Sequence, residues 1–117
     1  MWYIFPQIEG LGRSSTSKYY SIKSKEEAKA YLEHPVLGTR LIECAAILLG
    51  LEGKTAHEIF DSPDDCELRS CMTLFASISK KDSVFHRVLK KYFQGIPDFF
   101  TLTILTGKTI LGDKIFD

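Results

Sequence analysis

Residues 24–50, SKEEAKAYLEHPVLGTRLIECAAILLG, carry the signals of two consecutive helices. Ser24 and Glu27 form a capping box, in which the serine oxygen accepts the Glu27 N–H and the carboxylate reaches back. The first helix is predicted to run to His34, because Pro35 disfavours a helical residue before it.

The second helix is predicted over 37–49, where apolar residues recur at helical spacing. One stripe holds Leu37, Leu41, Cys44, Ala45 and Leu48, and it is widened by Ile42, Ala46 and Leu49. Such a stripe is broader than that of an ordinary surface helix. We therefore expect this helix, ending near Gly50 or Gly53, to be the central helix of the fold.

Start signals recur along the rest of the chain. Thr55 and Glu58 form a second capping box, which opens a short helix. Ser62 and Pro63 suit the N-cap and first position of the next helix, whose apolar face runs from 68 to 78. Asp82 is predicted to cap a third. The outer face of the helix that begins there carries Arg87, Lys90 and Lys91 and is expected to be solvated.

A last helix is expected from near Asp98 to Gly107, and the tail after it fits a strand, a docked segment or a frayed end. No linker or repeat divides the chain. The sequence therefore predicts one mostly helical domain over 1–117, with little or no β structure.

Composition excludes several classes of partner. The chain of 117 residues has 15 basic and 15 acidic residues, so its net charge is zero. Such a balance argues against nucleic acid or an anionic membrane as partner. No apolar run approaches the roughly 20 residues that span a bilayer. We expect a cytoplasmic protein.

Metal and disulfide chemistry lack a matching pattern. The three cysteines, Cys44, Cys66 and Cys71, and the three histidines have no ligand or framework spacing. The cysteines are expected to be reduced and mostly buried. We predict neither a metal site nor a cofactor.

The loop after the N-terminal aromatic run offers one candidate anion site. Gly10–Ser17 combines flexible backbone amides, hydroxyl groups and the cation Arg13, as a phosphate cradle does. The same composition also suits a polar connector. Trp2 and Tyr20, on either side of the loop, have faces on which a planar ring can stack, although aromatic residues more often belong to a core.

Charged groups elsewhere give further candidates. Arg69, followed by Ser70, is able to clamp a phosphate or carboxylate, or to pair with Asp65 one helical turn earlier. Glu43 and Asp65 are candidates for acid or base work. Helix capping accounts for an aspartate at 65, whereas nothing local accounts for Glu43.

Long ordered motifs resemble a known family. The run MWYIFPQIEGLGRSSTSKYYSIKSKEEAKAYLEHPVLGTRLIEC, followed by LRSCMTLF, is similar to an uncharacterised family. That family is numbered 1810 among domains of unknown function and is sometimes mislabelled calpastatin. The similarity covers about residues 1 to 105. Its members carry Trp-Met-Trp-x-x-Phe-Pro-Gln, Gly-x-Gly-x-Ser and Leu-Arg-Ser-Ser-Met-Thr-Leu-Phe motifs.

The family looks like a relative of the YbiA-like, or NADAR, proteins. These are mostly helical and act on ADP-ribose and related nucleotides as N-glycosidases. The resemblance therefore implies a multihelical YbiA-like fold and a cleft for a ribose-phosphate ligand. It gives more weight to Arg13, Ser14, Tyr20 and Arg69 as ligand-binding residues. The predicted ligand-binding set also includes Trp2, Gln7, Ser17 and Ser70.

The chain also departs from the family pattern. Members usually carry a further helix before the Trp-Met-Trp stretch, which we expect to be missing here. Cys71 stands where the family usually has Ser, and Glu67 where it often has Lys. Loss of a helix should expose the apolar face that it covered. We therefore expect a homodimer through that face or reduced stability.

Two functions follow from this reasoning. In the first, the protein binds ADP-ribose or a related nucleotide, with Arg13 and Ser14–Ser17 on phosphate and Arg69 on the ribose phosphate. Any glycosidase step would need a carboxylate beside an oxocarbenium-like centre, for which Glu43 or Asp65 is the candidate. In the second, the chain is a non-enzymatic helical module that binds proteins through its uncovered face.

Overall fold

The computed structural model describes residues 5–10, 21–61, 64–106, 109–111 and 114–116. Six helices precede a short hairpin in these ranges, in the order α2 (Lys25–Glu33), α3 (Leu37–Gly50), α4 (Ala56–Phe60), α5 (Asp64–Ser77), α6 (Val84–Phe93), α7 (Phe99–Thr106), β1 (Thr109–Leu111) and β2 (Lys114–Phe116). The predicted mostly helical fold is confirmed.

The two predicted capping boxes start helices. Ser24 Oγ accepts the Glu27 N–H at 3.1 Å, while the Glu27 carboxylate accepts the N–H of Lys23, one residue before the cap, at 3.1 Å. Thr55 and Glu58 make both reciprocal bonds of the box at the start of α4. These interactions are local, so the sequence alone identifies them.

The predicted cap of α6 is wrong by one residue. Ser83, in extended backbone, accepts the N–H of His86, whereas Asp82 has a φ of 68°. An N-cap residue normally adopts extended backbone, which the left-handed Asp82 does not.

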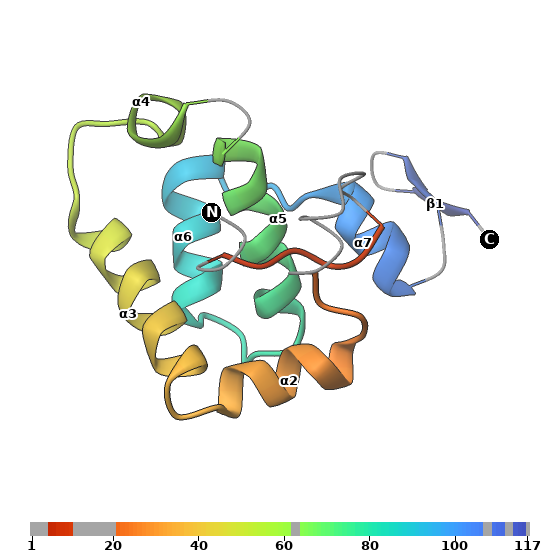
Figure 1. The fold of residues 1–117 in the computed structure, drawn as a ribbon. Coiled ribbons are helices and arrows are strands. Elements are labelled where there is room, and N and C mark those ends of the chain that lie inside the picture. Colours follow the sequence, from red (N-terminus) through yellow and green to blue (C-terminus); the bar gives the residue numbers. More distant parts are fainter. Residues whose placement is uncertain (1–4, 11–20, 62–63, 107–108, 112–113, 117) are drawn as a thin grey trace.

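Helix α5 is the central helix, and the prediction that α3 would be central is wrong. Figure 1 shows α5 surrounded by other helices, and it contacts α2, α4, α6 and α7. The α5 side chains at positions 70–76 are all buried. Helix α3 packs on α2 and α6 through one face only, with Leu41, Ala45 and Leu48 buried.

Aromatic rings link α5 to its neighbours in the core. The Phe75 ring is fully buried and lies 5.7 Å from the Tyr31 ring and 5.6 Å from the Phe85 ring, centroid to centroid. On the other side of the core, Phe5 meets Phe60 edge to face at 6.3 Å. Together these contacts join α2, α5 and α6 and connect the N-terminal segment to α4.

Both ends of α3 are fixed by side chains from outside the helix. At its start, His34 Nδ1 accepts the N–H groups of Val36 and Leu37 at 3.1 Å each. At its end, Lys91 Nζ of α6 donates to the carbonyls of Leu49 and Leu51. Lys91 is exposed, as predicted, and it also caps the carboxyl end of α3.

Minor β structure lies at both ends of the described chain. Ile8 and Ile22 form an isolated parallel bridge. Of the alternatives for the tail, the structure has the strand: β1 and β2 pair antiparallel, with Thr109 opposite Phe116. Among the described helices, none is both long and apolar enough to cross a membrane.

Candidate functional site

A cavity of about 260 Å³ opens where the first turns of α4 and α5 face the end of α6. Its lining combines hydroxyl, imidazole, carboxylate, thiol, guanidinium and aromatic groups, from Thr55, Ala56, His57, Asp65, Cys66, Arg69, Tyr92 and Phe93. Asp65, Cys66 and Arg69 lie within about one turn of α5. One face of this helix therefore presents a carboxylate, a thiol and a guanidinium cation to the cavity.

Arg69 is a cation in the lining of this cavity, and it makes no ion pair with the described residues. Its Nε is buried without a hydrogen-bond partner in the described part of the chain. The guanidinium carbon lies 4.8 Å from the centroid of the Phe93 ring, a cation–π contact. A half-buried guanidinium that stacks on an aromatic ring is suited to bind the paired oxygens of a carboxylate or a phosphate.

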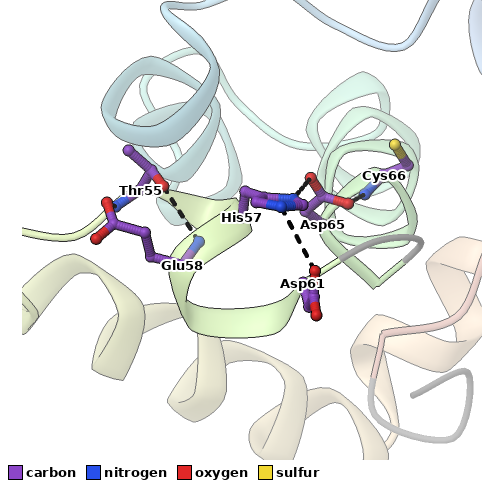
Figure 2. Close-up of polar contacts among 6 residues, drawn as sticks. All are labelled: Thr55, His57, Glu58, Asp61, Asp65 and Cys66. Carbon is purple, nitrogen blue, oxygen red and sulfur yellow. Dashed lines mark hydrogen bonds and ion pairs between the residues drawn. The ribbon is translucent and has the colours of Figure 1, made fainter.

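Asp65 is paired with His57 instead of Arg69. Its Oδ2 lies 3.3 Å from His57 Nδ1, and its Oδ1 accepts the backbone N–H of Cys66 at 2.9 Å. The other ring nitrogen of His57, Nε2, lies 3.4 Å from Asp61 Oδ1. Figure 2 shows the imidazole between the two carboxylates, with the Asp65 carboxylate turned from α5 toward α4.

Local sequence signals place His57. The Thr55–Glu58 capping box fixes the first turn of α4, on which His57 lies. The helix then ends at Asp61, whose φ is 62°. Because Asp61 follows His57 by one turn and its carbonyl accepts the Asp65 N–H at 3.0 Å, the turn connects both helices to the imidazole.

The thiol in the cavity is not an activated nucleophile. Although Cys66 is exposed overall, partial desolvation of its thiol raises the pKa, the Asp65 carboxylate raises it further, and the Arg69 charge lowers it by less. A raised pKa leaves the thiol protonated at neutral pH, which is its less nucleophilic form. The Cys66 sulfur also points away from the His57 ring (Figure 2). Contrary to expectation, Cys66 is exposed, Cys44 is half-buried and Cys71 alone of the three is buried.

The predicted site residues fall into separate places. Asp65 and Arg69 line the cavity. Ser70 is buried, and its hydroxyl donates to the carbonyl of Cys66 at 3.1 Å. Gln7 is half-buried in the N-terminal segment, and Glu43 lies exposed on α3, outside the cavity lining. The other predicted residues, Trp2, Arg13, Ser14, Ser17 and Tyr20, lie outside the described residues.

Sequence reasoning missed His57, Tyr92 and Phe93. His57 was set aside because the three histidines lack ligand spacing. A signal was present, since Asp61 follows His57 at the spacing of one helical turn. Tyr92 and Phe93 pack against the core and also line the cavity, and no local pattern distinguishes such a residue from an ordinary core aromatic residue.

Two further cavities of similar size carry less chemistry. One, of about 250 Å³, lies between α5, α6 and α7 and contains His86. The other, of about 270 Å³, lies beside the start of α2, where Lys23 pairs with Glu9 at 3.4 Å. No group of three metal-ligating side chains occurs in the described ranges. The Arg69 cavity is therefore the strongest candidate site.

Comparison with known proteins identifies the family of the chain. The family described as "Protein of unknown function (DUF1810)" matches residues 1–105. The crystal structure of the conserved hypothetical protein Rv1873 from Mycobacterium tuberculosis is similar, with 44% sequence identity and a TM-score of 0.87. The similarity covers 90% of this chain and 75% of that chain. A search of curated proteins returns no match. The chain belongs to the DUF1810 family.

Proposed function

We propose that this protein binds ADP-ribose or a related nucleotide, with a phosphate of the ligand on Arg69 in the cavity between α4, α5 and α6. The observation that carries the proposal is the buried Nε of Arg69, which has no hydrogen-bond partner among the described residues. Burying part of a charge without a partner is costly, and a bound anion would return the hydrogen bonds that the buried group lacks.

The remaining lining suits the rest of such a ligand. Thr55 supplies a hydroxyl group, and Tyr92 and Phe93 supply aromatic surface beside the cation. A volume of about 260 Å³ is slightly below the roughly 300 Å³ of the smallest drug-sized pockets. The cavity would therefore hold the ribose-phosphate part, with the remainder of the ligand outside it. The YbiA-like resemblance supplies the ligand class.

The Asp65 carboxylate has the character that a glycosidase step would need. It lies in the same cavity as Arg69, and His57 and the Cys66 N–H hold it in one orientation. A fixed carboxylate beside a ribose would stabilise positive charge that develops at the sugar. Binding is nevertheless the function proposed, because the described residues supply no activated nucleophile and no assigned general acid for the leaving group.

Thermal unfolding with and without about 1 mM ADP-ribose tests this proposal. A ligand with a Kd of about 0.1 mM would stabilise the native state by roughly 1.4 kcal/mol and raise the Tm by several degrees. Inorganic pyrophosphate should also raise the Tm, since it supplies the anion alone, whereas adenosine should not.

Arg69→Met should remove both shifts while keeping apolar contact with Phe93. Arg87→Met is the matched control, because Arg87 is exposed and its described ion pair is the 3.8 Å contact with Asp82 on the surface. A Tm shift that survives Arg69→Met would remove this cavity as the binding site. If neither ADP-ribose nor pyrophosphate changes the Tm of the wild-type chain, the proposed function is wrong.

A second candidate function, protein binding by a non-enzymatic helical module, has its own support. Large apolar side chains are exposed on α3 and α7, with Ile47 64% and Phe100 74% accessible. Exposed apolar surface of this kind is typical of interaction sites when it is contiguous. This function predicts that a partner protein binds the exposed face of α3 or α7, and that Arg69 takes no part in binding.

A further inference from the structure

We propose that the outer face of α3 is a self-complementary surface, through which two copies of this chain associate by antiparallel contact of their α3 helices. The proposal is independent of the nucleotide site. It rests on four exposed residues, Val36, Arg40, Glu43 and Ile47, which we call the α3 stripe.

The α3 stripe follows one line along the helix. Its members are spaced by four, three and four residues, the alternation at which helices pack along a single seam. Val36 is 55% exposed and Ile47 is 64% exposed. Val36 is the N-cap residue, but its backbone is helical and its carbonyl accepts the Arg40 N–H at 3.0 Å. Leu41, Ala45 and Leu48, which pack on the core, lie on the opposite side.

The order of side chains along the α3 stripe is self-complementary. From one end it runs apolar, basic, acidic, apolar, and its centre falls between positions 41 and 42. A two-fold axis through that centre places Val36 of one copy opposite Ile47 of the other, and Arg40 opposite Glu43. Apolar surface then meets apolar surface, and each charge meets its opposite.

The charged groups at the centre lack ion-pair partners among the described residues, although the Arg40 charge partly offsets the rise that burial causes in the pKa of Tyr31. Neither the Arg40 side chain nor the Glu43 side chain makes an ion pair or hydrogen bond in the described part of the chain. Glu43 had no local explanation in the sequence, and an antiparallel partner supplies one. Because symmetry makes each contact occur twice, the pair of helices gains two ion pairs and two apolar contacts.

The expected dimer is weak. The α3 stripe spans about 17 Å of helix, which is less contact than the roughly 800 Å² per partner of a standard interface provides. We expect a Kd on the order of 0.1–1 mM, so association must be measured at high concentration.

Sedimentation equilibrium from about 10 µM to 1 mM provides the test. The average mass should rise from the monomer value of 13.3 kDa toward twice that value. Arg40→Glu and Glu43→Arg should each weaken association about tenfold, because each replaces two attractions with two repulsions. Lys29→Glu, the same charge change on the exposed side of α2, should leave association unchanged.

Mixing the two single variants gives the decisive measurement. In the mixture, each Glu at 40 faces an Arg at 43, so association should return to the wild-type level in the heterodimer. An ion pair within one chain cannot be restored in this way. A wild-type chain that stays at the monomer mass at 1 mM would overturn the proposal. The α3 stripe would then be a candidate surface for a different protein. A mixture that associates no better than either variant would overturn the antiparallel arrangement.

Discussion

Helices α3 and α5 have the same length, 14 residues each, but composition and burial are reversed between them. Helix α3 is the more apolar, yet it buries four residues, whereas α5 carries four charged residues and buries nine. Mean hydropathy therefore fails to identify the central helix. Position in the packing decides burial, and α5 lies among α2, α4, α6 and α7.

Helix α5 tolerates burial because its buried hydroxyl groups are satisfied within the fold. Ser70 donates to the carbonyl of Cys66, and Thr73 to that of Arg69 at 2.8 Å. Thr73 also accepts the N–H of Asp98 at 2.8 Å, which joins α5 to the start of α7. Hydroxyl groups that bond to the preceding turn leave no unpaired donor, so their polarity costs little in the core.

The largest effect should come from truncating the central ring of α5. Phe75→Ala removes contacts with both Tyr31 and Phe85 from a fully buried position. We expect the free energy of unfolding to fall by about 3–5 kcal/mol, as for other buried Phe to Ala changes. Urea unfolding at neutral pH measures it. A loss below about 1 kcal/mol would mean that α5 is not the centre of the core.

Local signals and tertiary packing differ in how far the sequence reveals them. The caps at Ser24 and Thr55 were predictable because their partners lie within four residues. The burial of α5 and the capping of α3 by Lys91 were not, since both depend on segments far apart in sequence. Asp82 failed as a cap because its backbone is left-handed, which composition does not show.

The candidate site likewise has some features that the sequence reveals and others that depend on tertiary packing. Asp65 and Arg69 share one helix face, so the sequence could suggest that both meet one ligand. It could not show that Asp65 pairs with His57 and leaves Arg69 without an ion pair to it, because that choice depends on how α4 folds back on α5. The aromatic wall from α6 is likewise a tertiary feature. Three-dimensional contact, and not motif length, selects the members of the site.

A smaller effect should come from the buried acid of α5. Burial raises the pKa of Glu67 above its ordinary value of 4.5, and the nearby Asp64 carboxylate raises it further. Between the ordinary and raised values the native state binds more protons than the unfolded state does. Stability therefore falls as pH rises through this window, and the loss is complete above the raised pKa.

Glu67→Gln should consequently be more stable than the wild-type chain at pH 7, by less than the effect of Phe75→Ala. The difference should close as pH falls below the ordinary range, where the wild-type carboxyl group is also neutral. Urea unfolding at several pH values checks this dependence. Glu43→Gln on the exposed face of α3 is the matched control and should show no such trend. A difference that does not change with pH would assign the effect to packing instead of charge.

The smallest effect should come from the outer face of α3, where Ile47→Ala sharpens the contrast with Phe75→Ala. Ile47 is 64% exposed, so truncation removes little buried surface. Alanine also forms helix slightly better than isoleucine, and the free energy of unfolding should change by no more than about 0.5 kcal/mol. The measurement belongs at about 10 µM, where a dimer with a Kd near 0.1–1 mM is dissociated and cannot contribute. A loss of 2 kcal/mol or more would match a buried Ile to Ala change and would mean that this face is covered within one chain. A null result at 10 µM, with weaker association of the same variant at 1 mM, would instead assign Ile47 to contact between chains.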